Sequence, residues 1–252
     1  MTRDAKSGHY MSSLSCVEIL VSLFFSGFIC DSDPCNRRSR DHFILSKGHA
    51  APALYAILTE MGYIHKDELK TLRQYGSRLQ GHPVYHKLPC LDCSSGSLGQ
   101  GLSVAVGMSL SLRLDLQLSH IYVLIGDGEC QEGQLWEAAM AAVHYKLDSI
   151  IAIIDKNNLQ ISGSVDEVMS LGDLESKWNS FGWEVFSVNG HDLNELGIAF
   201  QKARMMTGKP KIIIADTIKG YGVSFIEGNL CYHTAPLTDE EFTTAMQILR
   251  GC

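Results

Sequence analysis

The stretch that decides the fold is Ile121-Tyr122-Val123-Leu124-Ile125-Gly126-Asp127-Gly128, which is followed further along the chain by Ile150-Ile151-Ala152-Ile153-Ile154-Asp155-Lys156-Asn157-Asn158. Each stretch begins with a short apolar, β-branched run, which is typical of a strand buried on both faces of a parallel sheet. The segment 131–146 between them repeats apolar residues at helical spacing. The polar residues after the two strands should therefore meet at the carboxyl edge of one sheet, where parallel α/β sheets bind their ligands.

These strand ends carry the residue types of a metal–diphosphate site. Asp127 and Asn157 offer hard oxygen donors, which suit a Mg²⁺ or Ca²⁺ ion that also grips a diphosphate. Gly126 and Gly128 let the backbone approach phosphates closely. Asp-Gly alone is common in turns, whereas strand, Gly-Asp-Gly, helix, strand and Asn-Asn in that order is far more specific.

Composition limits the classes of function. The 252 residues, 45% of them hydrophobic, suit one large α/β domain over 1–252. A formal net charge of −7 argues against a nucleic-acid partner. The eight cysteines indicate reduced thiols of a cytoplasmic protein, and Cys90-x-x-Cys93 has no second pair at zinc spacing. The apolar run 17–29 is interrupted by polar residues and is too short to span a membrane.

The rest of the chain alternates strands and helices. Further strands are predicted at 43–45, 183–188 and 211–216, and helices at 15–26, 49–61, 66–75, 98–116, 174–181 and 192–206. Ser15-x-x-Glu18 has the pattern of a capping box, and Asp192 that of an N-cap. The segments 76–97 and 157–173 are predicted to be loops. This alternation predicts an α/β fold, a parallel sheet flanked by helices on both faces.

Several short motifs follow one another in a fixed order: Ser7-Gly8-His9 with Ser12, Leu45-Ser46-Lys47-Gly48-His49-Ala50, Gly81-His82-Pro83, Gly96-Ser97-Leu98-Gly99-Gln100-Gly101, Gly126-Asp127-Gly128-Glu129 with Gln131-Glu132-Gly133, Lys219-Gly220 and a late His233. In this order they resemble the amino-terminal, diphosphate-binding half of transketolase, a thiamine-diphosphate enzyme. The resemblance runs through nearly the whole chain and implies the thiamine diphosphate-binding fold of the diphosphate (PP) type.

The resemblance also implies roles for individual residues. Mg²⁺, for which Ca²⁺ or Mn²⁺ can substitute, would be held by Asp127, the side chain of Asn157 and the carbonyl of Leu159. The cofactor, thiamine diphosphate, would contact Ser12, His49, Gly96, Ser97, Leu98, Gly128, Glu132, Asn157, Ile161, Lys219 and His233. His9, His82 and His233 would act on the sugar, because histidine donates, accepts and shuttles protons near neutral pH.

The implied activity is transfer of a two-carbon ketol unit from a ketose phosphate to an aldose phosphate, as in the pentose phosphate pathway. In the family, a pyrimidine-binding domain, which supplies the glutamate that activates the cofactor, and a carboxyl-terminal domain follow this one. Here the sequence ends at Cys252, and only six residues precede Ser7, fewer than in family members. We therefore expect a subunit of a split transketolase, completed by a carboxyl-terminal subunit in a heterotetramer, with Glu132 at their interface.

Alternatives remain open on the residues alone. The α subunit of a 2-oxo-acid dehydrogenase or a 1-deoxyxylulose-phosphate synthase would share the Gly-Asp-Gly and Asn-Asn elements. A non-catalytic assembly subunit would keep the fold without turnover. A truncated gene fragment that never functions is the third alternative.

Overall fold

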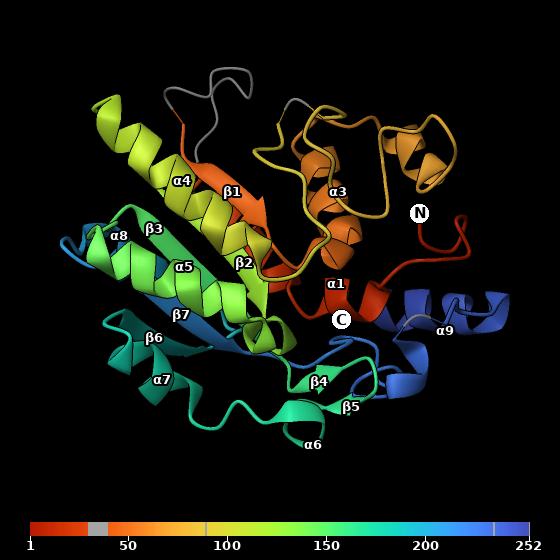
Figure 1. The fold of residues 1–252 in the computed structure, drawn as a ribbon. Helices are drawn as coiled ribbons and strands as arrows, with labels where there is room; N and C mark the ends of the chain where they lie inside the picture. Colours follow the sequence, from red (N-terminus) through yellow and green to blue (C-terminus); the bar gives the residue numbers. More distant parts are fainter. Residues whose placement is uncertain (30–39, 89, 234, 252) are drawn as a thin grey trace.

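The computed structural model of the protein describes residues 1–29, 40–88, 90–233 and 235–251. Its centre is a five-stranded sheet in the order β1-β2-β3-β7-β6, with every neighbouring pair parallel (Figure 1). The strands are β1 (His42–Leu45), β2 (Ile121–Gly126), β3 (Ile150–Lys156), β6 (Glu184–Asn189) and β7 (Lys211–Asp216). The central strands β2, β3 and β7 are buried up to their last residue, which explains their continuous apolar runs. The predicted α/β class is confirmed.

Helices cover both faces of this sheet. One face is covered by α2 (Val17–Phe25), α3 (Ala51–Glu60) and α8 (Leu193–Met205), and the other by α4 (Gln100–Leu114), α5 (Gly133–His144) and α7 (Leu174–Ser180). Tyr122 and Leu124 of β2 pack into the first layer, whereas Val123 and Ile125 pack into the second. Successive strand side chains point to opposite faces, so one strand supplies both cores.

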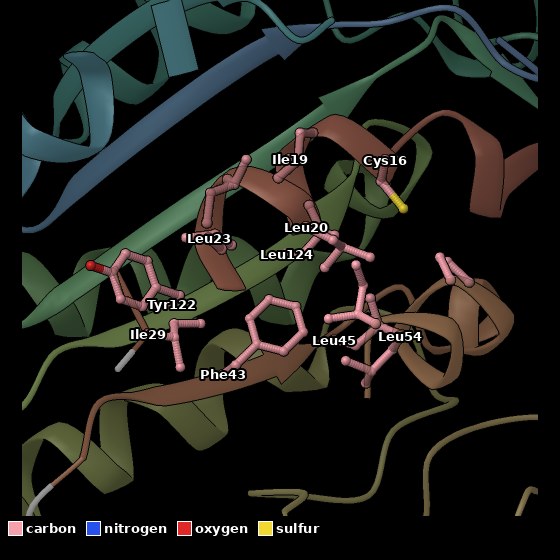
Figure 2. Close-up of a cluster of buried hydrophobic side chains, with 14 of the residues drawn as sticks. Cys16, Ile19, Leu20, Leu23, Ile29, Phe43, Leu45, Leu54, Tyr122 and Leu124 are labelled. Atoms are coloured by element: carbon pink, nitrogen blue, oxygen red, sulfur yellow. The ribbon is translucent and has the colours of Figure 1, made fainter. Parts of the chain in front are cut away.

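The first core fixes the position of α2 over the sheet. Figure 2 shows Ile19, Leu20 and Leu23 of α2 above Tyr122 and Leu124 of β2. The ring of Phe43 in β1 meets that of Phe24 edge-on, with 5.2 Å between centroids. With α2 anchored in this way, the short helix α1 (Tyr10–Leu14) before it lies against α3 at the carboxyl edge of the sheet.

Short elements surround that edge. They are η1 (Gly48–Ala50), η2 (Lys66–Thr71), η3 (Gly128–Gln131), the hairpin of β4 (Leu159–Gln160) and β5 (Gly163–Ser164), α6 (Val165–Met169) and η4 (Leu230–Tyr232). The segment 157–173, predicted to be a loop, therefore contains a hairpin and a helix. Ser164 and Glu167 form a capping box that starts α6. The described residues of 76–97 form neither helix nor strand, as predicted.

The helix α9 (Asp239–Arg250) was not predicted. It begins with a capping box in which the Thr238 side chain accepts from the Glu241 amide and the Glu241 carboxylate accepts from the Thr238 amide. Ala245 packs with Met11 of α1 and with Val223, so α9 buttresses the elements that carry the site. The Thr238-x-x-Glu241 pattern was a sequence signal for this helix.

Two local predictions are wrong and one is confirmed. The helix expected over 66–75 is the 3₁₀ turn η2, because Leu72 adopts an extended ψ of 128° and Arg73 has a positive φ of 62°. Ser15 and Glu18 do not form a capping box: α2 has Cys16 as its N-cap, without a side-chain bond. The Ser15 hydroxyl instead donates to Asp155, at 2.6 Å. Asp192 caps α8 as predicted.

The thiols of Cys16, Cys93, Cys130 and Cys231 are free, and burial raises the pKa of Cys93 to about 11. Cys30, Cys35 and Cys252 lie outside the described residues. Among the helices of the described chain, none combines the length and apolarity needed to cross a bilayer.

Candidate active site

The loops at the carboxyl edge of the sheet enclose an open cavity of about 520 Å³. The predicted site residues, apart from Ser97, all line it: His9, Ser12, His49, His82, Gly96, Leu98, Asp127, Gly128, Glu132, Asn157, Leu159, Ile161, Lys219 and His233. Ser97 is exposed in the same loop as Gly96 and Leu98. Segments scattered along the sequence thus meet at this edge. Asp127, Asn157 and Lys219 follow the central strands that end here, and the other residues come from the helices and loops around the edge.

The oxygen atoms predicted to bind a metal lie in the turns after β2 and β3. Asp127 accepts from the amide of Gly128 at 2.7 Å and from the amide of Asn158. The Asn157 side-chain oxygen accepts from the Leu159 amide at 3.2 Å, and the Leu159 carbonyl accepts from Lys219 Nζ at 2.7 Å. Burial, together with the nearby charge of Asp155, raises the pKa of Asp127 to about 6. A carboxylate, an amide oxygen and a carbonyl are a donor set suited to Mg²⁺.

The β4–β5 hairpin closes over the turn at Gly128. Gln131 Nε2 donates to Gln160 Oε1 at 2.9 Å, which ties η3 to the hairpin. A Cβ on Gly128 would lie 3.1 Å from Gln160 Oε1, so the space above this backbone is tight. Gln131, which stands in one of the sequence motifs without a role assigned to it, and Gln160, which no sequence pattern indicated, also line the cavity.

Three histidines gather on one side of the cavity. The ring centroid of His9 lies 5.2 Å from that of His49 and 5.6 Å from that of His233. Burial, together with the charge of Arg73, lowers the pKa of His9 to about 4. Burial, together with the charge of Lys219, lowers the pKa of His233 to about 4. Burial likewise holds the pKa of His49 and His82 below the usual value. At neutral pH each ring is therefore uncharged and offers one donor and one acceptor nitrogen.

Three buried polar atoms of these lining residues have no partner within the described part of the chain: Ser12 Oγ, His9 Nδ1 and His233 Nδ1. Buried polar groups in folded proteins are nearly always hydrogen-bonded. Their grouping in one cavity therefore indicates a polar ligand at this place.

A buried ion pair that sequence reasoning missed supports the site. Lys47 Nζ donates to Asp155 and to the Ser12 carbonyl, the latter at 3.1 Å. Asp155 also accepts from Ser15 and Thr217, and from Asn157 Nδ2 at 3.3 Å. Burial alone would lower the pKa of Lys47, but the charge of the neighbouring Asp155 raises it above the usual value. Lys47 stands in the motif at 45–50, but only the fold brings it to Asp155.

Glu129 is a second missed residue. Its buried carboxylate accepts from the Ser46 hydroxyl, from the Gly99 amide at 2.8 Å and from the Gly126 amide at 3.0 Å. It thereby joins three loops that line the cavity. Burial raises its pKa despite these donors. Glu132, three residues on, is by contrast exposed at the cavity.

An all-parallel sheet with a polar cavity at its carboxyl edge, holding a carboxylate–amide oxygen group and neutral histidines, defines a cofactor-binding α/β domain. The family described as "Transketolase, thiamine diphosphate binding domain" matches residues 1–250. The chain belongs to this family.

Named relatives agree with this placement. The chain is 41% identical over 243 residues to an apulose-4-phosphate transketolase subunit of Phocaeicola vulgatus, covering 96% of this chain and 86% of that one. It is 44% identical over 239 residues to a 6-deoxy-6-sulfo-D-fructose transketolase subunit of a Clostridium species, covering 95% and 87%.

Solved structures share the fold. The transketolase of Campylobacter jejuni superposes with a TM-score of 0.91 at 34% identity, covering 99% of this chain and 40% of that one. The Leishmania mexicana transketolase gives a TM-score of 0.89 at 30% identity, covering 98% and 39%. The chain thus spans about two fifths of the length of these solved transketolases.

Proposed function

We propose that the chain is the amino-terminal subunit of a transketolase that depends on thiamine diphosphate and Mg²⁺. With a separate carboxyl-terminal subunit it would transfer a two-carbon ketol unit from a ketose phosphate to an aldose phosphate. The observation that carries this proposal is the meeting, in one cavity, of the oxygen group around Asp127 with His9, His49, His82 and His233. Membership of the family and relatives that are named as single subunits of transketolases support it.

The residues present fit the two implied groups. Asp127, Asn157 and the Leu159 carbonyl would hold the metal ion. The Gly128 backbone would lie against the diphosphate, and the Lys219 ammonium would meet it because it offers charged donors to anionic oxygens. Ser12, His49, Gly96, Ser97, Leu98, Glu132, Ile161 and His233 would contact the rest of the cofactor. A cavity of about 520 Å³ suits a ligand of this size, and Ser12 Oγ and His233 Nδ1, which lack partners among the described residues, would be available to it.

Thiamine diphosphate, when bound, supplies the electron sink for a two-carbon carbanion. The chain's own residues have the tasks of orientation and proton handling. His9, His82 and His233 would hydrogen-bond the hydroxyl and carbonyl oxygens of the sugar and move protons at those oxygens. Because the lowered pKa values keep the rings neutral, each can donate through one nitrogen and accept through the other.

The partner subunit would contribute the pyrimidine-binding domain with its activating glutamate and the residues that grip the sugar phosphate. Residues 1–252 would then form one diphosphate-binding domain, and two pairs of chains would form a heterotetramer in the cytoplasm. Glu132 is exposed at the cavity, which supports its role at the interface with the partner.

The test combines the full chain with its candidate partner and assays ketol transfer between sugar phosphates with Mg²⁺ and thiamine diphosphate. We expect activity in the mixture and little in either chain alone. Full activity of the lone chain would refute the need for a partner. Decarboxylation of 2-oxo acids without ketol transfer would favour the dehydrogenase alternative. A mixture that fails to bind thiamine diphosphate in the presence of Mg²⁺ would favour an assembly role.

A further inference from the structure

We propose that His191, a residue outside the cavity, positions Lys219 for binding the cofactor diphosphate by clamping the loop that carries it. The inference rests on the proposed function, since it concerns the same site. His191 lies in the turn between β6 and α8, and its side chain is only 7% exposed. It acts through Lys219 and is therefore a positioning residue.

The His191 ring joins two segments through its two nitrogens. The Ile218 amide donates to Nε2 at 2.9 Å, and Nδ1 lies 3.0 Å from a carboxylate oxygen of Glu18 in α2. Since Nε2 accepts a hydrogen bond, Nδ1 must carry the ring proton and donate it in a hydrogen bond to Glu18. The carboxylate thus fixes the tautomer that the Ile218 amide requires. This makes a chain of contacts from α2, through the ring, to the backbone immediately before Lys219.

The turn between β6 and α8 lies very close to the loop that follows β7. A Cβ on Gly190 would lie 2.4 Å from the Thr217 side chain, so only glycine permits the approach. The Gly190 amide donates to the Asp216 carbonyl at 2.8 Å, and the His191 amide donates to Asn189 Oδ1 at 3.0 Å. These bonds hold His191 against the loop that follows β7.

The loop is held on its other sides as well. The ring of Tyr221 stacks on that of His191 with 3.6 Å between centroids and 16° between planes. The Thr217 hydroxyl donates to Asp155 on the cavity side. The backbone from 217 to 221 is therefore fixed between two elements, with Lys219 at its middle.

Lys219 depends on this placement. Its ammonium is buried and donates to the Leu159 carbonyl at 2.7 Å, within the oxygen group that we assign to the metal and diphosphate. A flexible lysine held in one orientation loses less entropy on binding than a free one. Release of the Ile218 amide would let the loop relax and would withdraw this charge from the diphosphate.

Two variants separate the clamp's contributions. His191→Phe keeps a ring to stack on Tyr221 but loses both hydrogen bonds, whereas His191→Gln can keep an acceptor for the Ile218 amide. In calorimetric titrations of the complex with thiamine diphosphate and Mg²⁺, we expect the Phe variant to bind about tenfold more weakly, the scale of one or two lost hydrogen bonds. The affinity of the Gln variant for thiamine diphosphate should stay within about threefold of that of the unsubstituted protein. The exposed His144→Phe, in α5, is the matched control and should bind unchanged.

A double-mutant cycle shows whether the effect passes through Lys219. Lys219→Ala should itself weaken binding, and adding His191→Phe to it should cause no further loss. Without cofactor, amide hydrogen exchange over 217–222 should be faster in His191→Phe and not in His144→Phe. Undiminished affinity in His191→Phe or Lys219→Ala, or fully additive losses in the double variant, would overturn the inference. If the unsubstituted complex fails to bind thiamine diphosphate at all, the proposed function itself fails, which is a separate result.

Discussion

The ammonium group of Lys47 and the carboxylate of Asp155 form an ion pair that solvent does not reach, their side chains being 1% and 0% exposed. Through its other bonds Asp155 holds Ser15, Asn157 and Thr217. One carboxylate thus links the start of α2 with the loops that follow β1, β3 and β7, each of which carries site residues.

We expect Asp155→Asn to lower the free energy of unfolding by about 3–5 kcal/mol, because it leaves the Lys47 charge buried without its partner. The double variant Lys47→Met, Asp155→Asn removes both charges and should be more stable than Asp155→Asn alone. Urea unfolding of the full chain measures both. A double variant no more stable than the single one would show that the buried charge is not the source of the loss.

Two glycines in α4 should respond to alanine in opposite directions. A Cβ on Gly101 would lie 2.4 Å from Ser46 Oγ, which bonds Glu129 and the Gly101 amide, so Gly101→Ala should cost about 1–3 kcal/mol. Gly107 is exposed, and a Cβ there meets nothing within 4 Å. Gly107→Ala should therefore stabilise the protein by roughly 0.5–1 kcal/mol, which is the difference in helix propensity between glycine and alanine.

Thermal or urea unfolding of the two variants provides the comparison, with each serving as the control for the other. Both substitutions exchange glycine for alanine in one helix, Gly101 in its first turn and Gly107 in its interior, and the space around the Cβ is the main difference between them. Equal stabilisation of both variants would mean that the Ser46 contact does not limit the position of α4.

Sequence patterns predicted the features that depend on residues close together in the chain, such as the central strands and the residues that follow them. The central strands are apolar without alternation, and the sheet topology alone brings together the residues that follow them, such as Asp127, Asn157 and Lys219. The Lys47–Asp155 pair and the Glu129 network could not be predicted, because their members are distant in the chain and meet only in the fold. The hairpin at Leu159–Gln160 has strands of two residues each, too short for a periodic signal.

The misassigned capping box at Ser15 shows how tertiary contacts override a local pattern. The Ser15 hydroxyl finds a buried carboxylate in Asp155, and Glu18 bonds His191 instead of its own helix start. A charged acceptor makes a stronger hydrogen bond than a backbone group. Thr238 and Glu241 do form the box that the same pattern predicts: Glu241 Oε2 accepts from the Thr238 amide, while Oε1 remains available to accept from the Tyr232 hydroxyl at 2.6 Å.

Substitution of His82 tests its role in handling the sugar. His82 lines the cavity, and a Cβ on Gly96 would lie 3.4 Å from its ring, which places the ring against the cofactor loop. We expect His82→Ala in the complex to lower kcat/KM for ketol transfer by about 10²-fold, the usual contribution of a positioned proton donor or acceptor. His86→Ala, an exposed position in the same loop, should leave kcat and KM unchanged. Full retention of both constants in His82→Ala would remove this assignment.

The neutral histidines predict how stability depends on pH. The pKa of His9 and of His233 is about 4 in the folded chain, against 6.5 for an ordinary histidine. Between these values the unfolded chain binds more protons than the folded one, so the stability due to these groups falls as pH is lowered from 7 toward 5. The double variant His9→Asn, His233→Asn cannot take up these protons and should lose less stability over the same interval.

Urea unfolding at both pH values measures the difference between the variant and the unsubstituted chain. The raised pKa of Asp127 changes stability in the opposite sense, since the folded state then holds the extra proton. Asp127 is present in both proteins, so its contribution cancels in the comparison. Equal losses in the two proteins would mean that His9 and His233 titrate alike when folded and unfolded. In that case burial would not hold them neutral, and the assignment of one donor and one acceptor to each ring would fail.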